Sequence, residues 1–263
     1  MDRWLLNTFS NWQLIVIVVG GAVCFGVGGF LLMRTLVPSI GGHSESRTLS
    51  SAFGLATGLF SFILAFTIGQ LYGNFTRAQA NARAEATVLS QVLRSSAGLP
   101  PGLALTIRNE SLQYAKEVQQ HEWSAMSHGH GTTLAWEDLD AMYGTMERHR
   151  TDASDNPYYA QTLARLNDLV VARRARLDDA NLSLPAIFQV MLLLGAALAL
   201  STTFYFKPFG EGIQIWMIGA ASALVGMAML VALMLDYPYS GSIAVSKAPF
   251  DTPTLLLLSG LHG

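Results

Sequence analysis

Long runs of apolar residues, free of any charge, alternate with polar stretches along the chain. The uncharged runs cover residues 14–33, 51–73, 186–206 and 212–235. Each has about 20 residues or more, and as a helix rising about 1.5 Å per residue each can cross roughly 30 Å of hydrocarbon. The pattern predicts four transmembrane helices and indicates no strand anywhere.

Residues 74–184, between the second and third runs, have the 3.6-residue period of amphipathic helices. The first apolar face consists of Ala82, Ala86, Leu89 and Leu93. "GLPPG" then ends that helix, "SHGHGTT" separates the next two, and Asn156 before Pro157 is a typical N-cap. The last apolar face consists of Leu163, Leu166, Val170 and Leu177. We therefore expect an all-α membrane protein whose second and third membrane helices extend into a cytoplasmic helical domain.

Composition and charge give the orientation. With 51% hydrophobic and 13% charged residues among 263, the chain is too apolar for one ordinary soluble domain. Four spans place both termini on the side of residues 74–184, and only Arg34, Arg47 and Lys207 of the 16 Lys and Arg fall on the other side. The remaining 13 make the larger side cytoplasmic by the positive-inside rule. The expected segments are 1–73, 74–184, 185–235 and 236–263.

One face of the second apolar run has an unusual composition. Steps of three or four residues along it give the stripe Gly58, Phe62, Phe66, Gly69, Gly73 and Arg77, with Gln70 beside it. In a ring of identical helices, this stripe would line an axial path with phenyl rings at two adjacent levels, and apolar constrictions can gate ions by dewetting. Alternatively, the glycines admit a neighbouring helix and the phenylalanines fill the remaining gap. The stripe alone leaves both interpretations open.

Charged residues flank the spans but do not enter them. Because no Asp, Glu, Lys, Arg or His lies inside a span, a proton-coupled transporter is disfavoured. Arg173, Arg174 and Arg176 precede the third span. They would contact anionic lipid head groups and fix orientation, or form a basic vestibule that concentrates anions.

Catalytic patterns are missing from the sequence. "HEWSAMSHGHG" gathers His121, Glu122, His128 and His130, but no second cluster at ligand spacing completes a metal site. The chain also lacks a phosphate loop and a Gly-x-Ser-x-Gly elbow. We expect no catalytic residue, no metal, no cofactor and no nucleic-acid partner, which disfavours a membrane enzyme.

Two short motifs resemble parts of bestrophins, a family of pentameric ion channels. "SFILAF", Ser61 to Phe66, resembles the neck of the second bestrophin helix, and "DYPYSG", Asp236 to Gly241, resembles the segment after the fourth. The resemblance implies a neck formed by Phe62 and Phe66 on a pore-lining second helix. The implied pore-lining set is completed by Gly58, Gly69, Gln70, Gly73 and Arg77, and the implied coupling residues are Asp236, Pro238 and Gly241.

The whole chain resembles a bacterial family described as bestrophin-like, through "EW" at Glu122, "RLNDLVVARRARLDDANLSLP" and "LDYPYSGSIAVSKAPF". This implies a homo-oligomer of the bacterial inner membrane, in contact with inorganic ions and membrane lipids. Gly58 departs from bestrophins, which have a third bulky neck residue there. Residues 242–245 replace the acidic run of calcium-sensing members, so calcium gating is not implied. A non-conducting scaffold or stress-related signalling protein is the alternative function.

Overall fold

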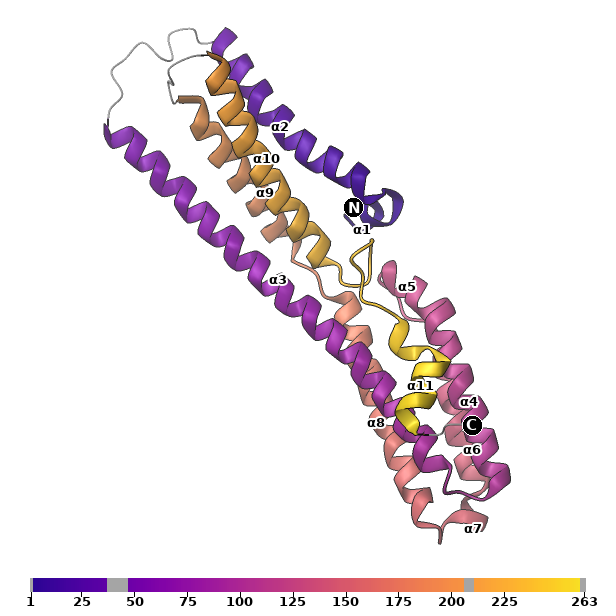
Figure 1. Ribbon diagram of the computed structural model, residues 1–263. Helices are drawn as coiled ribbons and strands as arrows, with labels where there is room; N and C mark the ends of the chain where they lie inside the picture. The colour runs from indigo at the N-terminus through magenta and orange to yellow at the C-terminus, as the bar shows by residue number, and fades with distance from the viewer. Residues whose placement is uncertain (1, 37–46, 206–210, 261–263) are drawn as a thin grey trace. The chain divides into compact units, whose positions relative to one another are not determined.

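The computed structural model describes residues 2–36, 47–205 and 211–260, and every regular element in these ranges is helical (Figure 1). The chain divides into two compact units, residues 1–73 with 183–236 and residues 74–182 with 237–263. Helix α3 (Arg47–Ser96) belongs to both units and runs unbroken for 50 residues. No proline interrupts it, so the predicted extension of the second apolar helix is confirmed.

Unit 1 contains the most apolar helices. They are α1 (Asp2–Thr8), α2 (Asn11–Leu36), the N-terminal part of α3, α9 (Ala186–Thr202) with a 3₁₀ turn (Thr203–Tyr205), and α10 (Glu211–Asp236). In the described ranges α2, α3 and α10 are each long and apolar enough to span a membrane. Helix α9 has 17 residues and qualifies only together with α8 (Pro157–Asn181) as a broken span. The count of four spans therefore stays a prediction, and the expected end of the third at Phe206 lies outside the described residues.

Small residues bring the helices of unit 1 close together. Helices α2 and α10 run side by side (Figure 1). A Cβ added at Gly226 of α10 would lie 2.9 Å from Ala22 Cβ and 3.0 Å from Val19 Cα. Helix α3 joins α9 through Thr57 and Thr202, whose hydroxyl oxygens are 3.3 Å apart. Close backbone approach restores the dispersion contacts that hydrophobic burial cannot supply in lipid.

Gly226→Ala is expected to loosen the packing of α2 against α10. The added methyl group would meet the backbone of Val19, which cannot rotate away, so overpacking should cost about 1–3 kcal/mol. The matched control is Gly21→Ala, because a Cβ at Gly21 has nothing within 4 Å. Thermal unfolding in detergent should show a lower midpoint for Gly226→Ala alone; equal midpoints for both variants would contradict this account of the packing.

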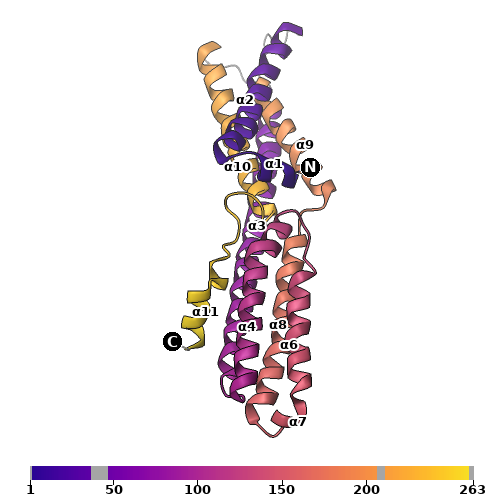
Figure 2. The same ribbon diagram turned by 90° about the vertical axis from the view of Figure 1, so that its right-hand side faces the viewer.

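Unit 2 is a helical bundle built around the C-terminal part of α3. Its other elements are α4 (Pro101–Glu117), a π-helical turn (Val118–Glu122), α5 (Trp123–Ser127), α6 (Leu134–Arg148), α7 (Arg150–Ala153), α8, a 3₁₀ turn (Ala248–Phe250) and α11 (Thr252–Ser259). Helices α4, α6 and α8 lie along this part of α3 (Figure 2). The apolar faces predicted for α3 and α8 meet in its core.

Several local predictions for unit 2 are confirmed. The α3 face is fully buried at Ala82, Ala86, Leu89 and Leu93. Helix α3 ends at Ser96, before "GLPPG", and residues 128–133 separate α5 from α6. Asn156 caps α8, because its side-chain oxygen accepts a hydrogen bond of 2.9 Å from the Tyr158 amide. Leu166 of α8 is buried, whereas Leu163, Val170 and Leu177 are partly buried.

The segment after α10 packs onto unit 2. The Trp123 indole N–H donates to the Val245 carbonyl at 3.1 Å, and the Tyr239 hydroxyl donates to the Ala78 carbonyl at 3.3 Å. The Trp123 ring also meets Tyr239 and Phe250 in edge contacts. Residues 237–260 are therefore integrated into the bundle and do not form a separate domain.

Candidate functional site

The stripe predicted on α3 lies on an exposed face of the chain. All of its members are exposed, and Phe62 and Phe66 keep 71% and 62% of their surface accessible. The same helix buries Leu64 and Leu71, which are 6% and 3% exposed. Helix α3 therefore has one face packed within the chain and another that its own chain leaves uncovered.

The glycines of the stripe have no packing role within the chain. A Cβ added at Gly58, Gly69 or Gly73 would meet nothing within 4 Å. By contrast, a Cβ at Gly195 of α9 would lie 2.6 Å from the ring of Phe60. Packing against a neighbouring helix of the same chain therefore explains Gly195 and does not explain the stripe.

Arg77, at the end of the stripe, is anchored by a carboxylate of α8. Its Nε donates to Asp179 Oδ1 at 3.2 Å, and Asn81 Nδ2 donates to Asp179 Oδ2 at 2.6 Å. The Arg77 side chain is still 52% exposed. The positive charge is thus held in place while part of it stays accessible.

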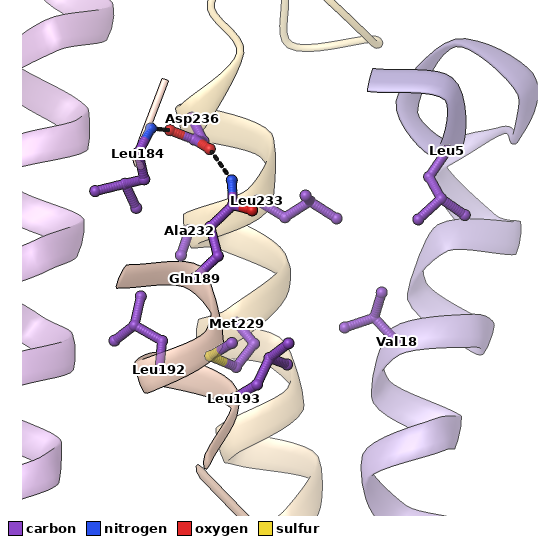
Figure 3. Close-up of a pocket in the computed structure, with 10 residues that line it drawn as sticks. All are labelled: Leu5, Val18, Leu184, Gln189, Leu192, Leu193, Met229, Ala232, Leu233 and Asp236. Atoms are coloured by element: carbon purple, nitrogen blue, oxygen red, sulfur yellow. Dashed lines mark hydrogen bonds between the residues drawn. The ribbon is translucent and has the colours of Figure 1, made fainter. Parts of the chain in front are cut away.

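Asp236 closes the C-terminal end of α10 onto the start of α9. Its Oδ1 accepts a hydrogen bond of 2.7 Å from the Leu184 amide, and its Oδ2 accepts one of 3.1 Å from Gln189 Nε2 (Figure 3). The residue is only 5% exposed. Two hydrogen bonds to one buried carboxylate fix the position of this helix end.

A mostly aliphatic pocket of about 220 Å³ lies beside Asp236 in unit 1. Leu5 and Val18, from α1 and α2, face Leu193 and Met229 across it (Figure 3). Its polar side chains are Asp236 and Gln189. The pocket is therefore apolar with one polar end.

Pro238 and Gly241, predicted to act with Asp236, belong to the segment held on unit 2. The Pro238 carbonyl accepts from the Val245 amide at 2.8 Å, and Ser240 Oγ donates to the Ser127 carbonyl at 2.7 Å. Gly241 has φ of 75°, a left-handed conformation that favours glycine at this turn. The short stretch 236–241 thus joins a fixed end of α10 to fixed partners in the bundle.

The interpretation of Arg173 and Arg176 as lipid-facing or vestibule residues is wrong. Both side chains are fully buried, because they continue the α8 face that contains Leu166 and Leu169. Arg174 alone is exposed, and its guanidinium lies 5.7 Å from the centre of the Trp136 ring. Only Arg174 therefore keeps the predicted surface role.

The two buried arginines form a network with two buried glutamates. Arg176 donates to Glu85 Oε2 through Nε at 2.5 Å and to Glu122 Oε2 through Nη2 at 2.5 Å. Arg173 donates to Glu122 Oε1 and, at 3.2 Å, to the Thr132 carbonyl. The network joins α3, the π-helical turn and α8.

The charges of this network compensate one another. Burial disfavours the charge of Glu122, but Arg176 and Arg173 outweigh it and lower the pKa of that carboxyl. Burial likewise opposes the charge of Arg176, yet Glu85 and Glu122 raise the guanidinium pKa. The Tyr114 hydroxyl donates to Glu85 Oε1 at 2.7 Å, and burial followed by Glu85 raises its pKa. With all its groups held in fixed charge states, the network suits a structural role better than proton transfer.

The histidines of "HEWSAMSHGHG" do not converge. His121 Nδ1 lies 2.7 Å from Glu117, and His128 Nδ1 lies 2.9 Å from the Ser124 carbonyl. Glu122 is committed to the two arginines. In the described ranges no group of His, Cys, Asp and Glu is placed to hold a metal ion.

Asp138 of α6 is the one carboxyl in the described bundle with a pKa raised into the physiological range. Burial, followed by Glu117, Glu137 and Glu110, raises its pKa from 3.8 to about 6, while Arg173 lowers it. Its Oδ2 is buried without a hydrogen-bond partner among the described residues. The ionised carboxylate is therefore poorly accommodated.

Asp138→Asn is expected to stabilise the protein near neutral pH. Between pH 3.8 and about 6 folded Asp138 keeps a proton that the unfolded chain has lost, so wild-type stability falls as pH rises through this window. The unfolding midpoint of Asp138→Asn should exceed that of the wild type at about pH 7 and approach it at about pH 4. Asp140→Asn, at an exposed carboxyl, is the control; the same pH trend there would contradict the assignment to Asp138.

Comparisons with known proteins agree with this architecture. A sequence model of the bestrophin-like domain matches residues 20–250. A crystal structure of a bacterial bestrophin homologue from Klebsiella pneumoniae superposes with a TM-score of 0.71 at 13% identity, covering 95% of this chain and all (100%) of the other. A variant of a Klebsiella pneumoniae homologue, in which one tryptophan is replaced by alanine, gives 0.69 at 14% identity over 96% and 99%. No curated protein is similar enough to count as a match. At these identities the structures show a shared fold.

Proposed function

Because the chain belongs to the bestrophin-like family, we propose that it assembles into a homo-oligomeric ion channel, a pentamer like the channels it resembles, with α3 lining the conduction path. The observation that carries this proposal is the exposed α3 stripe. Its glycines have no partner within 4 Å in their own chain, and its two phenyl groups stand open one helical turn apart. A ring of identical α3 helices gives every part of this stripe a role.

Exposure to lipid explains the stripe less well. Other helices of unit 1 also expose apolar side chains, as Phe25 of α2 does at 48%. The α3 stripe differs because it continues through Gly69 and Gln70 to the charged Arg77. A lipid-facing surface gains nothing from bare backbone or a polar amide, whereas a water-filled passage accommodates both.

The neck is formed by Phe62 and Phe66. Rings of phenyl groups at these two levels make a short apolar constriction, where water is poorly held and ions face a dehydration barrier. Gly58 on one side and Gly69 with Gly73 on the other leave wider, backbone-lined stretches. Arg77 supplies positive charge at the cytoplasmic end, with its position set by Asp179.

Asp236 and the residues after it couple the bundle to the membrane helices. Asp236 is bonded to the start of α9, and Tyr239 is bonded to α3 through the Ala78 carbonyl. A shift of this segment in the bundle would pull on both helices. Asp236, Pro238 and Gly241 therefore form the link through which the cytoplasmic unit influences the neck.

The setting of this channel is the bacterial inner membrane, with both termini and unit 2 in the cytoplasm. Its partners are inorganic ions, membrane lipids and further copies of the chain. Arg174, exposed before α9, is the arginine available to lipid head groups or to anions. The role is conducting, not catalytic.

Reconstitution of the purified protein tests this function. Native mass spectrometry in lipid nanodiscs should show one closed oligomer, because contacts between unlike faces of identical chains close into rings. Planar bilayers that contain the same preparation should show ion current. A stable monomer would contradict the channel, and a stable ring that never conducts, even with an opened neck, would favour the scaffold.

A further inference from the structure

Helix α3 and the segment that follows α10 border a second pocket, within unit 2. Its volume is about 340 Å³, and it is lined by Gln79, Arg83, Ser246, Ala248, Pro249 and Thr254. The first two belong to α3 and the others to the segment from 246 to α11. The pocket is thus shared by two stretches of chain far apart in sequence.

Arg83 brings an uncompensated positive charge to this pocket. Its guanidinium makes no ion pair and no hydrogen bond to any described residue, and it is exposed. The helix positions three or four residues away carry Gln79, Ala80, Ala86 and Thr87, so α3 itself offers no carboxylate. Arg77 and Arg176 of the same unit, by contrast, are each paired with an acid.

The other polar side chains of the pocket can also donate. The Gln79 amide and the Thr254 hydroxyl form no hydrogen bond to the residues that the structure describes. Ser246 Oγ accepts from the Ala248 amide at 3.2 Å, which leaves its own O–H to donate. An arginine fork with amide and hydroxyl donors is the set that recognises carboxylate or phosphate oxygens.

We propose that this pocket binds a small soluble organic anion through its carboxylate or phosphate group. The volume of about 340 Å³ equals that of roughly ten water molecules, which exceeds the needs of one inorganic ion. Arg83 lies ten residues beyond Gly73 on an unbroken helix, about 15 Å along its axis. Because the head-group layer is only about 5–8 Å thick on each side, a soluble ligand fits this position better than a lipid head group.

The ligand would fasten the segment after α10 to α3. Its anionic group would contact Arg83 and Gln79 on one side and the hydroxyls of Ser246 and Thr254 on the other. The same segment contains Tyr239 and Val245, which bond to α3 and to Trp123. On the proposed channel function, which this consequence alone requires, occupancy would stabilise one position of the link to the neck.

Binding is measured on the full-length protein in detergent by isothermal titration calorimetry, with glycerol 3-phosphate and succinate as probes. At least one probe should bind saturably. Arg83→Gln should weaken binding about tenfold or more, because it removes a charge-assisted hydrogen-bond donor. Thr254→Val should also weaken it. Arg94→Gln is the matched control, since Arg94 is exposed on α3, has no partner among the described residues and lies outside the pocket.

Three results would overturn the proposal. They are no saturable binding of either probe, equal loss in the Arg83 and Arg94 variants, and binding only to vesicles that contain phosphatidylglycerol, which would assign the arginine to lipid. Because calorimetry needs no current, a protein that binds the anion without conducting would reject the channel and keep the site. A conducting protein that ignores both probes would do the reverse.

Discussion

Replacing Phe62 and Phe66 together by alanine is expected to raise ion current several-fold. Two rings of phenyl groups would be removed from the narrowest part of the proposed path, so water would wet it and the barrier to ions would fall. Since both side chains are more than 60% exposed, their loss leaves no cavity inside the chain. The ring should therefore survive, unlike a protein with a core Phe→Ala substitution, which typically costs about 3–5 kcal/mol.

Planar-bilayer recordings of Phe62→Ala, Phe66→Ala and the double variant measure this effect, with oligomer size checked on each sample. The matched control is Phe25→Ala, which truncates an exposed phenylalanine of α2 outside the stripe and should leave the current unchanged. If Phe62 and Phe66 instead pack between helices, the double variant will lose its assembly and gain no current. That pair of outcomes would reject the neck.

Arg176→Met is expected to destabilise the cytoplasmic bundle by about 3–5 kcal/mol. The substitution would leave Glu85 and Glu122 buried with much of their compensation gone, and an unpaired buried charge is far more costly than a broken surface pair. Arg174→Met, two residues earlier and exposed, should change stability by less than about 0.5 kcal/mol.

Chemical unfolding followed by Trp fluorescence measures both variants, since Trp123 lies 5.4 Å from the Arg176 guanidinium. Replacing both glutamates by glutamine in the Arg176→Met background should recover part of the lost stability, because it removes the uncompensated charge. Equal stability of Arg176→Met and Arg174→Met would mean that the network does not hold the bundle together.

Features set by neighbours in sequence were predictable. The continuity of α3, its buried alanine and leucine face and the Asn156 cap all follow from local period, propensity and capping chemistry. Family motifs pointed to the bestrophin-like fold in the same way. The charged network was missed because its members come from separate elements, 37 to 91 residues apart in the pairs Glu85–Glu122 and Glu85–Arg176.

A signal for that network was nevertheless present. Glu85 falls between Ala82 and Leu89 on the apolar face of α3, and Arg173 follows Leu166 and Leu169 on the apolar face of α8. A charge on a face destined for burial requires a partner of opposite sign. Sequence position beside a membrane span suggested lipid contact for the arginines, but the helix face they occupy decided otherwise.

The position of Phe62 in the assembled oligomer tests the central claim most directly. An electron cryomicroscopy map of the wild-type protein in lipid nanodiscs would locate this residue relative to any symmetry axis. The account predicts a closed ring with Phe62 and Phe66 pointing at the axis from every copy of α3. A monomer, or a ring in which Phe62 faces the lipid, would contradict it.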